Sequence, residues 1–189
     1  MKNSAPSYLK HHFLIAMPHM ADPNFAQTVT YLVEHNEQGA MGLVINRPND
    51  LSLADVLEQL RPDDTPPALC QSLPIFAGGP VQPDRGFVLH PSGPTFQATL
   101  ELGELALSTS QDVLFAIADG SGPQQYLITL GYAGWEAGQL EAELVDNAWL
   151  TCPAATDILF DLPFDQRLTA AAARLGVNLS LLSAQAGHA

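Results

Sequence analysis

Cysteine is scarce in this sequence, with only Cys70 and Cys152 in a chain of 189 residues. The two are far apart, and neither belongs to a Cys-x-x-Cys motif or to a spacing typical of a structural zinc site. The sequence therefore shows neither a disulfide framework nor a redox pair. We expect both side chains to be reduced thiols with a structural role.

Basic residues are also few: seven Lys and Arg stand against 20 Asp and Glu, which gives a formal net charge of −13. They form no cluster. A nucleic-acid surface needs several basic side chains on one face, and an acidic chain is repelled by a polyanion at long range. Direct binding to DNA or RNA and docking on an anionic membrane are therefore disfavoured. Two arginines brought together by the fold can still bind a small anion.

Long apolar runs are absent as well. The run at 13–17 is interrupted by Pro18 and His19, well short of the roughly 20 residues that span a bilayer. The segment before this run lacks the apolar region and the small-residue cleavage pattern of a secretion signal. The sequence therefore predicts no membrane anchor and a cytoplasmic location.

Motifs that identify common activities are missing too. The chain has no Gly-x-x-x-x-Gly-Lys-Ser/Thr, no Gly-x-Gly-x-x-Gly after a strand, no His-Glu-x-x-His and no Gly-x-Ser-x-Gly. Its six histidines are scattered and show no zinc-binding spacing. We therefore expect no bound metal and no cofactor, and no local pattern assigns a catalytic residue.

Hydrophobic residues, in contrast, make up 47% of the chain. This content and a length of 189 residues suffice for one sizeable core, so we predict a single domain over residues 1–189. The 15 prolines and 14 glycines are spread along the chain as turn residues. The proline-rich stretch 61–67 is interpreted as a surface loop, because the residues before it hold too few elements for an independent core.

Apolar periodicity predicts the secondary structure. Runs rich in apolar and β-branched residues predict strands at 12–17, 28–34, 40–45, 73–77, 86–90, 96–100 and 125–130. Helical spacing predicts helices at 53–60 (capped by Ser52), 112–118, 137–146 and 165–175. Most connections between strands are too short for crossover helices. We therefore predict an α+β fold with a curled, mixed, mainly antiparallel sheet and helices laid on one side.

Polar side chains stand at the ends of predicted strands, where sites often form. Arg47 follows the third strand, and Arg85 and His90 flank a later one. If the arginines converge, they form a fork that suits a phosphate or carboxylate, and His90 can exchange a proton beside it. The alternative is structural: each arginine pairs with one of the many carboxylates, and His90 caps a strand.

Two glycine-containing segments also allow two interpretations. Gly78-Gly79-Pro80 follows a predicted strand and either makes a tight turn or brings backbone amides close to a ligand. The segment 131–135 leads through two glycines to Trp135 and a helix start, which is either an anion site or a packing device. The nearby carboxylates of Glu136 and Glu141 and the large indole favour packing.

Three separated blocks of the chain are recognisable together. They are 13–18 with 22–25, 34–36 and Gly39-Ala40-Met41-Gly42-Leu43-Val44-Ile45-Asn46-Arg47-Pro48; Gly78-Gly79-Pro80-Val81 with 85–90; and Gly131-Tyr132-Ala133-Gly134-Trp135 with Gly138-Gln139-Leu140-Glu141. In this order they resemble the AlgH/YqgE family, and the similarity runs from about residue 8 to about residue 175. One departure is Leu168 after Arg167, where similar proteins carry an aromatic residue; it should alter helix packing only modestly.

The resemblance implies a bacterial cytosolic protein whose bifurcated sheet curls into a partial barrel with helices packed around it. The family takes its name from a regulator of alginate production and is described as a transcriptional regulator, but it has no established catalytic activity or ligand. Nothing in this sequence resembles a helix-turn-helix. The matched polar positions form a candidate ligand-binding set: Asn46, Arg47, Arg85, His90, Trp135 and Gln139.

Two function hypotheses follow. The leading one is a cytoplasmic regulatory or binding protein that recognises a small anionic molecule or a protein partner near Arg47, Arg85 and His90. The alternative is an uncharacterised enzyme, a hydrolase or transferase acting on a phosphorylated metabolite, with His90 as general acid or base beside both arginines. The sequence leaves the ligand, the partner and the oligomeric state open.

Overall fold

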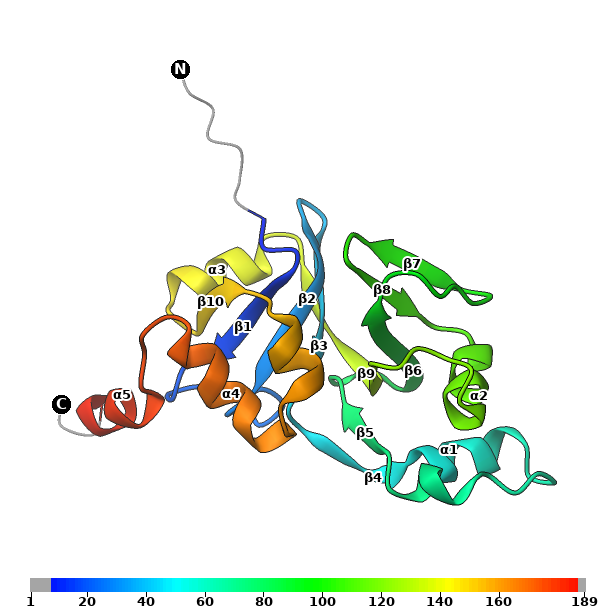
Figure 1. The fold of residues 1–189 in the computed structure, drawn as a ribbon. Coiled ribbons are helices and arrows are strands. Elements are labelled where there is room, and N and C mark those ends of the chain that lie inside the picture. The colour runs from blue at the N-terminus through cyan, green and yellow to red at the C-terminus, as the bar shows by residue number, and fades with distance from the viewer. Residues whose placement is uncertain (1–7, 187–189) are drawn as a thin grey trace.

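One ten-stranded sheet organises the computed structural model, which describes residues 8–186 (Figure 1). Its strands are β1 (His12–Ala16), β2 (Val29–Asn36), β3 (Gly39–Val44), β4 (Pro48–Ser52), β5 (Pro74–Ala77), β6 (Val81–Pro91), β7 (Thr99–Leu102), β8 (Leu105–Ser108), β9 (Leu127–Glu136) and β10 (Trp149–Pro153). The helices are α1 (Leu53–Leu60), α2 (Gln111–Asp119), α3 (Gln139–Val145), α4 (Phe164–Ala173) and α5 (Leu179–Ala186), with a 3₁₀ turn η1 (Ala68–Gln71) and a π turn η2 (Asp157–Asp161).

The sheet divides at β9. The strand order is β10-β1-β2-β3-β9-β6-β8-β7, and neighbours along this path are antiparallel. Thr129 in the first part of β9 lies between Phe87 of β6 and Phe76 of β5, which runs parallel to β9. The last part of β9, from Ala133 to Glu136, pairs with β3 instead. The predicted α+β class, with a mixed, mainly antiparallel, bifurcated and curled sheet, is confirmed.

Glycines permit the close contact of β5 and β9 at this division. Gly131 has a left-handed φ of 77°, and a Cβ added to it would lie 2.4 Å from the carbonyl oxygen of Gly79. A Cβ added to Gly78 would lie 2.4 Å from the carbonyl oxygen of Gly131. The two glycine segments therefore pack against each other, backbone to backbone, which accounts for both of them as packing devices.

Apolar side chains fill both faces of the sheet. One cluster joins strands from both ends of the strand order, for example Phe13 of β1 and Leu107 of β8, and so lies inside the curl. A second cluster packs under α1 and α2, and a third packs under α3. Ala171 of α4 belongs to the cluster inside the curl, so helices cover both faces, as the resemblance implied. The expectation of helices on one side only is wrong. The buried strands are apolar on both sides, which a one-sided sheet would not be.

The boundaries differ from the predicted ones where strands are short or bent. The predicted strand 96–100 lies instead at β7 (Thr99–Leu102), and β4, β8 and β10 were not predicted. The predicted strand 125–130 continues through Gly131 to Glu136. Its continuation has a physical cause, because a glycine with positive φ bends this strand without ending it.

Candidate functional site

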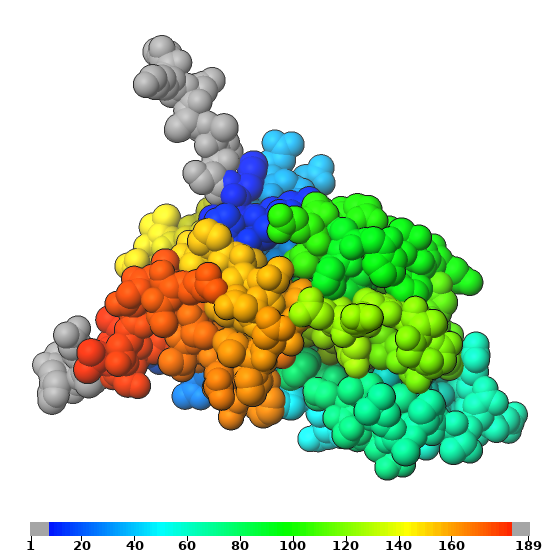
Figure 2. All heavy atoms as spheres, in the orientation of Figure 1, coloured from blue at the N-terminus to red at the C-terminus, as the bar shows by residue number. Residues whose placement is uncertain are grey.

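A cavity of about 270 Å³ lies at the seam where the two ends of the sheet approach each other. One side is the turn between β7 and β8, from Leu102 to Leu105, and the other is the segment after β10 that contains Ala154 and Thr156. Figure 2 shows the dark blue start of β1 lying against the green β7–β8 hairpin at this seam. We call this space the seam cavity.

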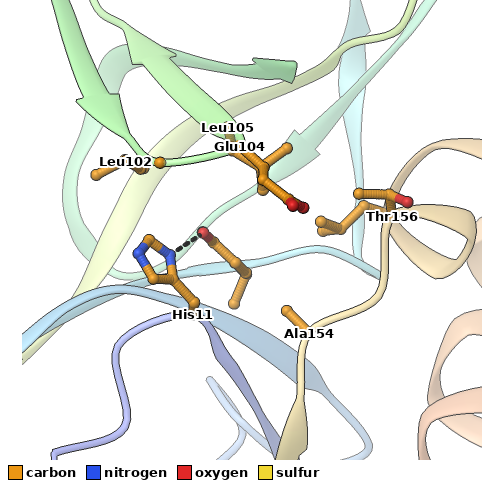
Figure 3. Close-up of a pocket in the computed structure, with 9 residues that line it drawn as sticks. His11, Leu102, Glu104, Leu105, Ala154 and Thr156 are labelled. Atoms are coloured by element: carbon orange, nitrogen blue, oxygen red, sulfur yellow. Dashed lines mark hydrogen bonds between the residues drawn. The ribbon is translucent and has the colours of Figure 1, made fainter. Parts of the chain in front are cut away.

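The walls of the seam cavity are apolar and its rim is polar. Leu102, Leu105 and Leu159 line it and are 4%, 7% and 1% exposed. Glu104 and Thr156 also line it and are exposed. Figure 3 shows the Glu104 carboxylate extending from the β7–β8 turn toward the side that carries Thr156. Apolar walls combined with a few polar groups are typical of small-molecule binding sites.

A histidine–tyrosine pair completes the seam cavity. His11 Nδ1 lies 2.8 Å from the hydroxyl of the buried Tyr31, the contact drawn dashed in Figure 3. The His11 backbone has a left-handed φ of 66° and is fixed on both sides, because its N–H donates to Leu32 and its carbonyl accepts from Ala154, each at 2.9 Å. The ring is therefore held in place by the backbone as well as by the phenol.

Both members of this pair are electrically neutral near pH 7. Burial lowers the pKa of His11 below its ordinary value of 6.5, and the neighbouring charge of Lys10 lowers it further, against an opposing effect of Glu34. Burial raises the pKa of Tyr31, so the phenol keeps its proton. The pair can thus donate a hydrogen bond to a ligand, or accept one from it, while remaining uncharged.

Asn46 and Arg47, from the predicted set, lie side by side and hold the segment between β1 and β2. The Asn46 side chain accepts a hydrogen bond from the Val29 N–H at 2.9 Å. The Arg47 guanidinium donates to the carbonyls of Asn24 at 2.7 Å and Ala26 at 3.0 Å. Much of its donor capacity is therefore used within the protein.

Arg85 and His90 lie on the same strand, β6, in different surroundings. Arg85 is exposed, stacks 5.2 Å over the ring of Phe87 and is 3.4 Å from the Gln82 side chain. His90 is 0% exposed. None of the hydrogen bonds or ion pairs among the described residues joins Arg47, Arg85 and His90 to one another.

The His90 ring is hydrogen-bonded at both nitrogens. Nδ1 lies 2.9 Å from the Pro91 carbonyl, which can only accept, so Nδ1 carries a proton. Nε2 lies 2.7 Å from the Ser108 hydroxyl, which is itself 2.9 Å from the Thr99 hydroxyl. In the neutral ring, Nε2 accepts from Ser108. This series of hydrogen bonds links β6, β7 and β8.

Trp135 and Gln139, the other two predicted residues, lie at α3 or beside it. The indole N–H of Trp135 donates to Glu143 Oε2 at 2.7 Å, and the indole N–H of Trp149 reaches the same oxygen at 3.3 Å. Gln139 accepts a hydrogen bond from the Glu136 N–H at 3.0 Å with its side-chain oxygen. Both predicted residues thus anchor α3 to the sheet.

Arg167 is a buried cation that the sequence interpretation did not single out as a site. It is 7% exposed, donates to the carbonyls of Ile45 and Leu162, and stacks 4.8 Å over Phe76. Burial lowers the pKa of Arg167 to about 10, which still leaves it charged near pH 7. The guanidinium joins β3, β5 and the start of α4 in one contact.

The thiols and the acidic side chains offer no metal centre. Cys70 and Cys152 are free and buried, and burial raises the pKa of each thiol. Within residues 8–186, no three His, Cys, Asp or Glu side chains gather in a way that would hold a metal ion. In the same part of the chain, no helix is both long and apolar enough to cross a membrane.

Sequence reasoning missed the residues of the seam cavity for a topological reason. His11, Tyr31, Glu104 and Thr156 come from four parts of the chain. Pairing of β1 with β2 and β10 joins three of these parts, and the curl of the sheet adds the β7–β8 turn that carries Glu104. The one available signal was His11 itself, a polar residue directly before a buried strand.

The fold defines a class: α+β proteins with a bifurcated, curled sheet and helices packed around it. Comparison with known proteins gives the family. The chain belongs to the AlgH-like family, whose model matches residues 13–180, and this confirms the resemblance.

Similar proteins support the assignment over the full length. The UPF0301 protein AlgH of Pseudomonas aeruginosa is 80% identical over 189 residues, with 100% of both chains covered, and a UPF0301 protein of Stutzerimonas stutzeri is 76% identical with the same coverage. The solution structure of P. aeruginosa AlgH matches with a TM-score of 0.83 and full coverage of both chains. A crystal structure of a Corynebacterium diphtheriae protein, 20% identical with a TM-score of 0.72 and coverage of 97% and 94%, shares the fold.

Proposed function

We propose that this protein is a cytoplasmic binding protein with a regulatory role, and that its ligand is a small molecule held in the seam cavity. One observation carries the proposal: three buried leucines line a space of about 270 Å³ whose lining also includes a carboxylate, a hydroxyl and the His11–Tyr31 pair. Apolar walls with a few convergent polar groups are the usual features of such a site. The cytoplasmic location is the one that the resemblance to the AlgH/YqgE family implies.

A regulatory role is consistent with the position of the seam cavity. A ligand there contacts the β7–β8 turn, the residue before β1 and the segment after β10, which are at opposite ends of the strand order. Its binding free energy therefore depends on how closely the two ends approach. Any partner that senses the same separation is coupled to the ligand by linkage.

The anion hypothesis is the second candidate, and Arg85 is the observation in its favour. Its guanidinium is exposed and stacked on Phe87, and it forms no ion pair among the residues described. Arg85 therefore keeps donors for a phosphate or carboxylate. Arg47 has fewer to offer because two backbone carbonyls already accept from it.

The enzyme alternative depends on His90, and one contact favours it. The Ser108 hydroxyl lies 2.7 Å from His90 Nε2, the geometry in which an imidazole activates a nucleophile. Both residues are 0% exposed, however, and the Thr99 hydroxyl is also within hydrogen-bond distance of Ser108. A substrate therefore has poor access to this pair of side chains, and we rank the binding function first.

A ligand screen with matched variants tests these candidates. Small-molecule binding would be followed by methyl and amide NMR shifts in the unsubstituted protein, in Ala154→Phe, which fills the seam cavity, and in Arg47→Ala and Arg85→Ala. We expect hits that shift Leu102, Leu105 and Leu159, are lost in Ala154→Phe and persist in both arginine variants. Binding that survives Ala154→Phe but disappears in Arg85→Ala would instead indicate a site at Arg85.

A further inference from the structure

The rim of the seam cavity carries a carboxylate that has no ion-pair partner among residues 8–186. Glu104 lines the cavity, and no Lys or Arg is among the lining residues. Among residues 8–186, Glu104 forms no ion pair. The nearest basic residue in sequence to His11 is Lys10, and its ammonium lies 3.5 Å from the Glu34 carboxylate. The seam cavity therefore attracts cations and repels anions.

The remaining polar groups add no opposing charge. His11 is neutral near pH 7 because burial and Lys10 lower its pKa, and Tyr31 is a protonated phenol because burial raises its pKa. Thr156 contributes a neutral hydroxyl at the rim. The net charge of the whole chain, −13, further raises the local concentration of small cations. Among residues 8–186, Lys10 adds a positive charge near His11, but its ammonium is paired with Glu34, which leaves the Glu104 carboxylate as the unpaired charge of the lining.

The size of the seam cavity limits what can enter. About 270 Å³ is slightly below the lower end, roughly 300 Å³, of pockets that hold drug-sized ligands. A space of this size, with leucines on several sides, suits one ring or a short branched chain. It excludes a polymer or a folded protein segment.

We infer that the seam cavity selects a small organic ammonium ion, with its apolar body between Leu102, Leu105 and Leu159 and its charged nitrogen beside Glu104. This inference rests on the proposed function and specifies the ligand class for the same site. The apolar contacts contribute a binding free energy that grows with the buried apolar area of the ligand, and the carboxylate favours ligands that carry a positive charge. The ligand is a cation, in contrast to the anion that the arginines suggested from the sequence.

Three probes of one shape separate charge from fit. Benzylamine carries the ammonium, benzyl alcohol is its neutral isostere, and benzoate is the anionic analogue. Each would be titrated into the full chain at pH 7 and low ionic strength, with the methyl shifts of Leu102, Leu105 and Leu159 as the readout. We expect benzylamine to bind most tightly, benzyl alcohol more weakly and benzoate least.

A charge-matched pair of variants identifies the carboxylate. Glu104→Gln removes the charge at the cavity and should weaken benzylamine binding about fivefold, as expected for a partly exposed ion pair, while leaving benzyl alcohol unchanged. Glu101→Gln removes the same charge from the same hairpin, where Glu101 is exposed and is not part of the lining. It should leave both affinities unchanged.

The outcomes distinguish this inference from the proposed function. If benzylamine and benzyl alcohol bind equally at the three leucines, or if Glu104→Gln and Glu101→Gln have equal effects, selection by charge is refuted and the binding site stands. If none of the probes and none of the compounds in the wider screen shifts these leucines, the seam cavity is not a binding site and both proposals fail.

Discussion

His11 is the residue in which backbone geometry, hydrogen bonding and protonation are most closely linked. Its backbone φ of 66° lies in the left-handed region, which is uncommon for residues other than glycine, and its ring hydrogen-bonds a buried phenol. Folding lowers its pKa below 6.5, so the unfolded chain binds a proton more readily than the folded one as the pH falls. The contribution of His11 to stability is therefore present above pH 6.5 and is lost on acidification.

We predict that His11→Asn reduces this pH dependence. Asparagine tolerates the left-handed backbone, keeps a polar side chain and does not titrate. Between pH 7.5 and pH 5, the unsubstituted protein should lose more stability than His11→Asn, because only the unsubstituted protein binds an extra proton on unfolding at this position. Thermal unfolding at both pH values measures the difference. His19→Asn, at an exposed position, is the control, and equal slopes for all three proteins would contradict the prediction.

Among the structural elements, the contact between β5 and β9 depends on the absence of side chains. Gly131→Ala would place a Cβ 2.4 Å from the Gly79 oxygen in addition to straining a left-handed backbone. Gly120 has a similar φ of 84° but no atom within 4 Å of an added Cβ. We expect Gly120→Ala to cost about 1 kcal/mol from strain alone and Gly131→Ala about 2–4 kcal/mol, because overlap adds to strain. Denaturant unfolding of both variants tests this, and similar losses would show that the contact can relax.

The same strand explains why some elements were predictable and others were not. Local sequence predicts β1 to β3 from their continuous apolar runs and α1 from its capping residue. These signals are local because burial and capping depend on neighbouring residues. The full length of β9 could not be predicted in this way, because Gly131 resembles a strand end in the sequence but only bends the strand in the fold. The strands β4, β8 and β10 have five residues or fewer and become strands only through their partners. The seam cavity depends on the curl, which no local pattern encodes.

At the scale of the whole molecule, β9 and Arg167 connect the two parts of the sheet. β9 pairs with β3 on one side of the division and with β5 and β6 on the other. Arg167 donates to the carbonyl of Ile45, next to β3, and stacks over Phe76 of β5. The core cluster inside the curl also includes residues from both parts. Because this cluster is shared by both parts, we expect the chain to unfold as a single domain.

The two tryptophans provide a test of this unity. Trp135 and Trp149 both lie in the cluster under α3 and share Glu143 as acceptor, so fluorescence reports one part of the sheet only. Far-UV circular dichroism reports the whole chain. We predict that both signals change in one transition with the same midpoint, and that Gly131→Ala, at the division of the sheet, shifts both midpoints equally. A dichroism change that precedes the fluorescence change would mean that the α1–α2 side unfolds alone, and that the seam cavity can open without loss of the rest.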